Sequence, residues 1–174
     1  EPNGLKVFGY TEPCPFVRKD GAIVCPFRNQ SGFLYASVSR DNGETWSVPR
    51  QTNFPDSMAR FSTDRLPDGR VYLINNPGPG RMNRSLLTIA LSDDGGLFDR
   101  AWIISGEPTT QRFKGKGKRD GWQYPNSLVW KNSLFVAYSA NKEDVAITRT
   151  ELPDGCEIWQ AVRVREGDRP PRIA

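Results

Sequence analysis

The sequence predicts an all-β protein built from repeated four-stranded units, on three observations. Helical periodicity of apolar residues is hard to find along the 174 residues. Short runs rich in β-branched and aromatic residues recur instead, bounded by Gly, Pro, Asn and Asp. Equivalent turns also recur at one spacing, because Asp20 and Asp68 are 48 residues apart and Ser39 and Ser92 are 53 apart. That spacing is close to the roughly 40–50 residues of a four-stranded propeller blade.

Each predicted blade begins with a tight hairpin and continues into a second strand pair. The hairpins cover 16–27, 63–74 and 127–138, and the second pairs cover 33–47, 86–104, and 145–150 with 157–164. We therefore expect one partial propeller domain over residues 1–174, with blades at about 7–50, 51–106 and 120–165, a basic loop at 107–121 and a tail at 166–174. A propeller needs at least about four blades to close. Three blades are then half of a six-bladed propeller, completed by a missing N-terminal half or by a second copy.

The composition removes several classes of active site. The chain contains no histidine, which excludes Ser-His-Asp and Cys-His nucleophile systems and the common zinc sites. The three cysteines, Cys14, Cys25 and Cys156, form no C-x-x-C pair, so no metal site is expected. Any catalysis must use carboxylates, Tyr, Lys or Arg. Cys14 and Cys25 flank the turn at 18–21 and lie on paired strands if that segment is a hairpin, which leaves buried free thiols and a disulfide as alternatives.

The net charge of +4 comes largely from one segment, 114–119. No aromatic residue interleaves with its basic side chains, so we interpret it as a solvated loop and expect no nucleic-acid partner. No stretch approaches the roughly 18 apolar residues of a membrane span. The N-terminal segment lacks the pattern of a signal peptide, but the chain starts at Glu1 and leaves a secreted or periplasmic parent protein open.

The sharpest local motif lies in the first predicted blade. It fits S-x-D-x-G-x-T-W, and its fixed positions are Ser39, Asp41, Gly43, Thr45 and Trp46. The Asp carboxylate accepts backbone N–H groups, Gly takes a positive φ, Thr ties the loop, and Trp anchors it between strands. A degenerate copy follows, with Ser92, Asp94 and Gly96 at the fixed positions and Phe98 in place of the Trp. We expect Trp46 and Phe98 to be buried, and the loops to lie on the rim opposite the active-site face.

These loops resemble the Asp box, or BNR repeat, of sialidase-type propellers. The resemblance extends over about residues 7–152 and includes the segments 11–35, 83–92, 122–125, 134–138 and 144–147. It implies a sialidase-like β-propeller, with this chain equivalent to the C-terminal half of a bacterial exo-sialidase-like protein. The Asp box is structural in that family, so it supports the fold more strongly than an activity.

In sialidases the C-terminal half carries Glu, Arg, Arg and Tyr in that order, and the matching residues here are Glu12, Arg28, Arg84 and Tyr124. The resemblance implies that Tyr124 is the nucleophile, that Glu12 takes its proton, and that the arginines bind the sugar carboxylate bidentately. Sialidases are known exceptions to two-carboxylate glycosidases because their nucleophile is Tyr. We expect Tyr124 within hydrogen-bond reach of a carboxylate, preferably that of Glu12.

Each candidate also has a structural alternative. Glu12 is alternatively a polar residue at a strand end, and the two arginines are alternatively exposed, solvated side chains. Tyr124 is alternatively a half-buried aromatic residue under the basic loop. Weaker candidates are Arg60, Asp64 and Arg81, the last a rival to Arg84.

The sequence therefore predicts an exo-α-sialidase-like glycoside hydrolase that cleaves terminal, acidic sugars from a glycan and needs no cofactor. The family's first Arg and its Asp acid/base belong to N-terminal blades that precede this segment. The alternatives are a glycosidase acting on another sugar and a non-catalytic carbohydrate-binding or interaction module.

Overall fold

A computed structural model describes residues 9–151 as strands, turns and loops. It contains eleven strands and no helix in that range. The strands form three antiparallel sheets, each in simple sequence order. The first sheet contains β1 (Phe16–Val17), β2 (Ile23–Phe27), β3 (Phe33–Ser39) and β4 (Arg50–Pro55); the second contains β5 (Ser62–Arg65), β6 (Val71–Asn75), β7 (Leu87–Ser92) and β8 (Arg100–Ser105); the third contains β9 (Trp122–Trp130), β10 (Ser133–Ala140) and β11 (Asp144–Glu151). Between residues 9 and 151 no helix has the length and hydropathy of a membrane span.

The three predicted hairpins are confirmed. β1 pairs with β2, β5 with β6, and β9 with β10, in antiparallel registers around the expected turns. The second strand pair of the first blade was expected to cover residues 33–47. Its second strand, β4, instead begins at Arg50, beyond that range. Ser47 still bonds to Val38 in both directions, so the Asp-box loop closes there before the chain enters β4. The first sheet therefore extends to Pro55 rather than ending at residue 50.

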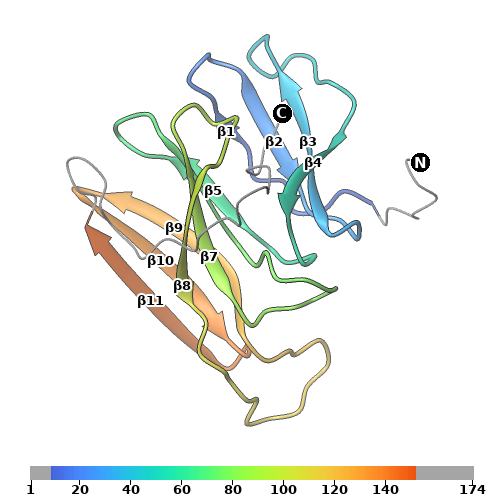
Figure 1. The fold of residues 1–174 in the computed structure, drawn as a ribbon, viewed down its shortest axis with the longest axis vertical. Helices are drawn as coiled ribbons and strands as arrows, with labels where there is room; N and C mark the ends of the chain where they lie inside the picture. Colours follow the sequence, from blue (N-terminus) through green and yellow to red (C-terminus); the bar gives the residue numbers. More distant parts are fainter. Residues whose placement is uncertain (1–8, 152–174) are drawn as a thin grey trace.

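The sheets pack face to face through two apolar layers (Figure 1). Alternating side chains of β6 divide between them, since Val71 and Leu73 face the first sheet while Tyr72 and Ile74 face the third. The layer between the first two sheets also contains Phe16, Val24, Leu34, Phe54, Phe61 and Phe98. The layer between the second and third contains Leu87, Ile89, Leu91, Trp102, Leu134, Val136 and Tyr138. This face-to-face packing of sequential antiparallel sheets, two with four strands and the third with three described strands, is the construction of a β-propeller.

The first strands of the three sheets lie next to one another, with contacts between β1 and β5 and between β5 and β9. Because every sheet is an antiparallel meander, successive connections lie at alternate ends of the blades. The segment before β1, the β2–β3, β6–β7 and β10–β11 connections, and the two crossovers between sheets share one end, which we call the site face. The remaining turns, including both Asp boxes, share the opposite end, which we call the Asp-box rim. The expected placement of the Asp boxes is confirmed by this topology.

The first Asp box forms the local bonds that its motif predicts. Asp41 accepts the Thr45 backbone N–H at 2.9 Å and the Thr45 and Ser39 hydroxyls, and Ser39 Oγ accepts the Gly43 N–H. These bonds, led by the Thr45 hydroxyl, lower the pKa of Asp41 to about 2. In the degenerate copy, Asp94 accepts the Gly96 and Leu97 N–H groups and the Ser92 hydroxyl.

The expected burial holds for only one of the two box aromatics. Phe98 is buried and forms T-shaped, edge-to-face contacts with Phe16 and Phe54. Trp46 is 45% exposed, so the prediction that it packs between strands is wrong. Its indole N–H donates to the Gly43 carbonyl at 3.0 Å, which folds the ring back onto its own loop instead of into the core.

Cys14 and Cys25 are free thiols, as the first alternative predicted. Burial raises the pKa of both above the ordinary thiol value. Cys14 Sγ lies 3.6 Å from the Thr63 carbonyl oxygen, which places this thiol between the first and second sheets. Cys156 and the strand expected at 157–164 lie outside the described residues.

Within residues 9–151, the third sheet exposes apolar side chains on one face. On its outer side, away from the second sheet, the exposed large apolar side chains are Leu128, Trp130, Val145 and Ile147. Large exposed apolar patches of this kind mark interaction surfaces. We call these four residues the outer patch.

Candidate functional site

The four matched residues come together on the site face although they are far apart in sequence. Glu12 precedes β1, Arg28 directly follows β2, Arg84 lies in the β6–β7 connection, and Tyr124 lies near the start of β9. An isolated bridge between Thr11 and Arg28 pairs the backbone beside Glu12 with the end of β2. The first two sheets contribute three of the residues, and the third sheet contributes the tyrosine.

Arg28 is shared between a carboxylate and a backbone carbonyl. Its Nε lies 2.6 Å from Glu12 Oε2, and its Nη1 donates to the Met58 carbonyl at 3.0 Å. The Arg28 side chain is 16% exposed and the Glu12 side chain 33%. Among the described residues Glu12 forms no hydrogen bond with the Tyr124 hydroxyl, and its role as proton acceptor stays a prediction.

Arg84 is the most deeply buried of the four, at 3% exposure. Its Nε and Nη1 atoms are buried without a hydrogen-bond partner among the described residues. Burial lowers the pKa of the guanidinium from its ordinary value; Tyr124 and Asp56 oppose that shift, and Arg28 adds to it. A buried guanidinium with unsatisfied N–H groups is costly, which indicates a place for an anionic ligand.

Tyr124 owes its position to a β-bulge. Ala137 pairs with Asn126 and Ser139 with Gln123, so Tyr124 and Pro125 together oppose one residue of β10. Tyr124 has a φ of 54°, the conformation that re-aims a bulged side chain. Two cations face its ring, with Arg84 Cζ 5.3 Å and Lys142 Nζ 4.9 Å from the ring centroid.

The backbone around Tyr124 is tied directly to Arg84. The Trp122 N–H donates to the Arg84 carbonyl at 2.8 Å. A Cβ added to Gly121, which has a φ of 104°, would lie 2.0 Å from that same carbonyl oxygen. Asn141 holds Gly121 from the other side, since its Oδ1 accepts the Gly121 N–H and its own N–H donates to the Gly121 carbonyl. Only glycine fits this approach of β9 to the β6–β7 connection.

The basic loop is folded onto the β10–β11 turn rather than being freely solvated along its whole length. Glu143 accepts the Arg112 and Phe113 backbone N–H groups and pairs with Lys118 at 2.8 Å. These bonds, led by the one from Lys118, lower the pKa of Glu143 to about 2. The loop therefore braces the turn that carries Lys142 beside Tyr124.

Asp56 is a site residue that sequence reasoning missed. It is 2% exposed, and its Oδ2 accepts the Met58 and Ala59 N–H groups at 2.9 and 3.1 Å while Asn75 Nδ2 donates to Oδ1. Burial raises the pKa of Asp56 to about 6, against the hydrogen bonds and the charge of Arg28, which lower it. The available signal was an Asp directly after a strand at a blade crossover, where its carboxylate can cap the following turn.

Backbone strain is concentrated on the site face. Eight described residues other than glycine have a positive φ, and six of them lie there: Glu12, Met58, Met82, Tyr124, Asn141 and Lys142. The other two, Asn42 and Lys131, lie in turns of the Asp-box rim. Such conformations cost of order 1–3 kcal/mol each and gather at functional sites.

The weaker candidates have other surroundings. Arg60 donates to the Asn126 side chain at 3.0 Å, and Asp64 is exposed on β5 and accepts the Arg65 N–H. Arg81 is exposed, whereas its rival Arg84 is buried beside Tyr124. No cluster of three or more His, Cys, Asp or Glu residues able to hold a metal ion occurs in the part of the chain described.

Comparison with family models matches residues 5–137 to the BNR repeat-like domain. The chain belongs to this family. Its two Asp boxes at 39–46 and 92–98 are then the BNR repeats of a sialidase-like propeller.

Solved structures with the same fold come from glycosidases and related enzymes. A mutant of the NanB sialidase from Streptococcus pneumoniae shares 21% identity and a TM-score of 0.55, over 73% of this chain and 20% of that one. The intramolecular trans-sialidase from Ruminococcus gnavus, in complex with oseltamivir carboxylate, has 14% sequence identity and a TM-score of 0.59. The match covers 87% of this chain and 34% of that one. The α-L-arabinofuranosidase Arb93A from Fusarium graminearum has 16% sequence identity and a TM-score of 0.58. The match covers 82% of this chain and 47% of that one.

The structural similarity to these proteins shows the propeller fold and does not assign a substrate. The chain spans less than half the length of each of these structures. Comparison with curated protein sequences gives no match.

Proposed function

We propose that the BNR domain is part of a glycoside hydrolase of the exo-α-sialidase type, which acts on a terminal acidic sugar. The observation that carries this proposal is the buried guanidinium of Arg84, whose Nε and Nη1 atoms lie unsatisfied near Arg28 and Tyr124. A planar carboxylate accepts bidentate bonds from guanidinium groups, and its charge compensates the cost of burying them. An acidic sugar supplies that anion next to its anomeric carbon.

Tyr124 then attacks the anomeric carbon as the glycosidic bond to the leaving oxygen breaks, and a glycosyl-tyrosine forms. The phenolic proton passes to Glu12, because an unaided tyrosine is almost wholly protonated at neutral pH. Water later attacks the same carbon, gives its proton to the acid/base that had protonated the leaving oxygen, and releases the tyrosine, which takes its own proton back from Glu12. Arg84 and Lys142 face the Tyr124 ring and stabilise negative charge that develops on its oxygen.

The leaving oxygen needs a proton from a residue outside this chain, since the family's Asp acid/base and first Arg lie in N-terminal blades. The outer patch supports the proposal that the three blades pack against a missing half or against a second copy. The complete reaction therefore belongs to the closed propeller.

A non-catalytic carbohydrate-binding domain is the second candidate. The pairing of Glu12 with Arg28, instead of with Tyr124, favours it, because the proton acceptor is then engaged elsewhere. A glycosidase that acts on another sugar is the third candidate. In that case we expect a neutral ligand at the same face.

The decisive experiment measures binding and turnover separately. N-acetylneuraminic acid is titrated by calorimetry into the wild-type chain and the Arg84→Ala, Tyr124→Phe and Arg65→Ala variants. We expect Arg84→Ala to weaken binding by about 100-fold, as for loss of a charged hydrogen-bonding partner. Tyr124→Phe is expected to bind normally, and Arg65→Ala, on the Asp-box rim, is the control.

Turnover is measured on an activated aryl glycoside of the same sugar, using the protein that contains the remaining blades. The hydrolase proposal requires loss of turnover in Tyr124→Phe with binding retained. Binding without turnover in the wild type identifies the carbohydrate-binding domain instead. Preference for a neutral arabinofuranoside, unaffected by Arg84→Ala, contradicts the acidic-sugar assignment.

A further inference from the structure

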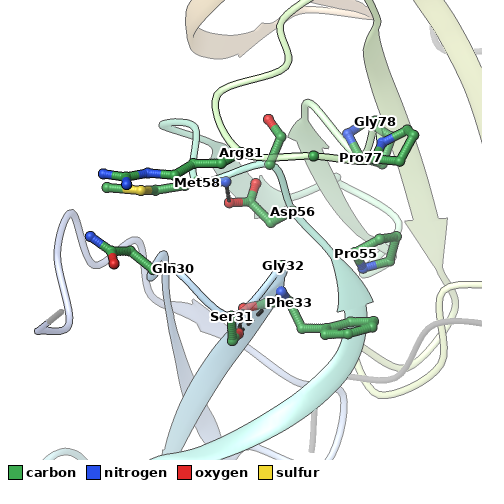
Figure 2. Close-up of a pocket in the computed structure, with 13 residues that line it drawn as sticks. Gln30, Ser31, Gly32, Phe33, Pro55, Asp56, Met58, Pro77, Gly78 and Arg81 are labelled. Carbon is green, nitrogen blue, oxygen red and sulfur yellow. Dashed lines mark hydrogen bonds between the residues drawn. The ribbon is translucent and has the colours of Figure 1, made fainter. Parts of the chain in front are cut away.

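The exposed positive charge of the site face is gathered over the third blade. Between the first and second blades lies a pocket of about 490 Å³ (Figure 2). Arg81 is the one cation among the described residues that line this pocket, and the Asp56 carboxylate lines it as well. The β8–β9 connection, in contrast, contains the segment 114–119, which has four cations and no carboxylate. This part of the site face therefore has the charge that a polyanionic partner requires.

The basic segment belongs to a loop whose base is closed by hydrogen bonds. The loop extends beyond the ends of the strands that it joins, β8 and β9 (Figure 1). Asp120 accepts the backbone N–H and the side-chain N–H of Gln111, both at 3.0 Å. The Thr109 hydroxyl donates to Asn141 Oδ1 at 2.6 Å, which ties the loop to the β10–β11 turn. A loop that is ordered in advance binds a partner without a large ordering cost.

The acidic residues nearest to the segment are already paired. The Glu143 side chain is 2% exposed and pairs with Lys118 at 2.8 Å. Asp144 accepts two bonds from Arg112, each at 2.7 Å. These two carboxylates are therefore neutralised by two cations of the loop and do not compete with a partner for the others.

The remaining cations of the segment are exposed and form no ion pair in the part of the chain described: Lys114, Lys116 and Arg119. Exposed Lys142 connects them to the candidate site. Its Nζ lies 3.9 Å from the position of a Cβ added to Gly117, and 4.9 Å from the centroid of the Tyr124 ring. Because Arg84 faces the same ring, positive charge continues from the candidate site to the loop. A partner with matching negative charge relieves the repulsion among these cations.

The types of these cations favour sulfate groups as the partner's charges. A lysine ammonium is a compact point charge with three donors, whereas the guanidinium fork of Arg84 matches a planar carboxylate. Three unpaired cations within the six residues 114–119 also require closely spaced anionic groups. A linear sulfated polysaccharide supplies such groups along one chain.

Two other polyanions fit the loop less well. No aromatic residue lies within 114–119 on which a nucleic-acid base could stack. Phe113, the exposed aromatic residue before the segment, has the charged groups of Arg112 and Lys118 5.7 and 5.6 Å from its ring centroid. These cations would have to enter a lipid layer together with the ring, which is costly.

We propose that the segment 114–119, together with Lys142, is a docking surface for a linear sulfated polysaccharide. The surface holds such a chain beside the anion site and is separate from the residues that bind the terminal sugar. This inference rests on the proposed function only for the choice of a glycan as the partner, because the charges and contacts of the loop stand without it.

The test uses a heparin hexasaccharide as the probe and two triple variants with the same change of charge. The loop variant combines Lys114→Gln, Lys116→Gln and Arg119→Gln. The rim variant replaces three exposed cations in turns of the Asp-box rim, by Lys19→Gln, Arg40→Gln and Lys131→Gln. Calorimetry measures the affinity of the probe at low and at physiological salt. Amide chemical shifts of residues 112–119 and 141–144 report where the probe binds.

We expect the loop variant to bind the hexasaccharide about tenfold more weakly than wild type, as for the loss of three exposed ion pairs. Its affinity is also expected to depend less steeply on salt, because fewer counterions are released on binding. The rim variant is expected to match wild type in affinity and in chemical shifts. N-acetylneuraminic acid tests the proposed function in parallel, and we expect all three proteins to bind it equally.

Equal losses of hexasaccharide affinity in the two triple variants, or chemical shifts confined to other residues, overturn the docking surface. Equal binding of a hyaluronan hexasaccharide, which carries carboxylates only, overturns the choice of sulfate. Tighter binding of an oligothymidylate or of phosphatidylserine vesicles, lost in the loop variant, overturns the polysaccharide as partner.

The outcomes for the two ligands separate this inference from the proposed function. Loop-dependent binding of the hexasaccharide without binding of N-acetylneuraminic acid supports the docking surface and overturns the acidic-sugar function. Binding of N-acetylneuraminic acid without binding of the hexasaccharide overturns the docking surface and leaves the function standing.

Discussion

Asp56 shows how one buried side chain links the candidate site to the stability of the blades. Burial raises its pKa to about 6 from the ordinary 3.8, although three hydrogen bonds favour the charged form. Because the folded-state pKa exceeds the unfolded one, the folded state binds the proton more tightly between about pH 4 and 6. The resulting stabilisation is fully present below about pH 4 and is lost as the pH rises through about 6.

We expect Asp56→Asn to remove this pH dependence. The rise of the Asp56 pKa from 3.8 to about 6 corresponds to a change of about 3 kcal/mol in the free energy of unfolding between about pH 4 and 6. Urea unfolding at pH 4, 5, 6 and 7 measures it, with Asp64→Asn, an exposed carboxylate on β5, as the matched control. If the free energies of unfolding of wild type and Asp56→Asn change with pH in the same way, the burial of this carboxylate is contradicted.

Among the structural elements, the two Asp boxes make an internal comparison, because their aromatic residues have opposite environments. Phe98 is 2% exposed within the layer between two sheets, and Trp46 is 45% exposed on its own loop. Phe98→Ala is expected to cost about 3–5 kcal/mol, as for other buried aromatics. Trp46→Ala is expected to cost about 1 kcal/mol, close to one hydrogen bond. Thermal and urea unfolding measure both, and equal losses refute the difference in burial.

The contact between β9 and the β6–β7 connection depends on Gly121. A methyl group there collides with the Arg84 carbonyl, and the φ of 104° disfavours any side chain. We expect Gly121→Ala to cost about 3 kcal/mol, from overpacking and backbone strain together. It is also expected to abolish binding of an acidic sugar by displacing Arg84.

Gly117→Ala is the control in the same loop, since an added Cβ meets only Lys142 Nζ at 3.9 Å. Its positive φ of 72° leaves an expected cost of about 1 kcal/mol. Urea unfolding with calorimetric titration of N-acetylneuraminic acid measures both effects. Full binding by Gly121→Ala would show that Arg84 keeps its position without this close approach.

On the scale of the whole chain, we expect the outer patch of the third blade to govern assembly. Val145 and Ile147 are 78% and 67% exposed on a sheet face whose opposite side is a packed core. Burying such side chains in an interface contributes roughly 1.5–3 kcal/mol each. We expect the chain to self-associate, and Val145→Lys with Ile147→Lys to abolish that association.

Sedimentation equilibrium measures the association, with Val48→Lys as the control because Val48 is equally exposed in the first Asp-box loop. Wild-type chain that stays monomeric at high concentration is incompatible with a patch that needs a partner. Association that persists in the double variant assigns the contact to another surface.

Local patterns in the sequence determined the hairpins, the box loops and the family, because their interactions lie within a few residues of one another. Asp41, Thr45 and Gly43 form the same bonds whatever surrounds the loop. The resemblance also singled out Glu12, Arg28, Arg84 and Tyr124, and the alternating ends of the strands bring the segments that carry them to one face.

Only the tertiary structure decided how deeply each group is buried and which groups face each other. It buried Arg84, left Trp46 in solvent, paired Glu12 with Arg28, and placed Asp56 within electrostatic range of both arginines. These outcomes depend on the packing of one sheet on the next and on crossovers between residues dozens of positions apart. Burial and electrostatics are sums over such long-range neighbours, so a motif read along the chain does not contain them.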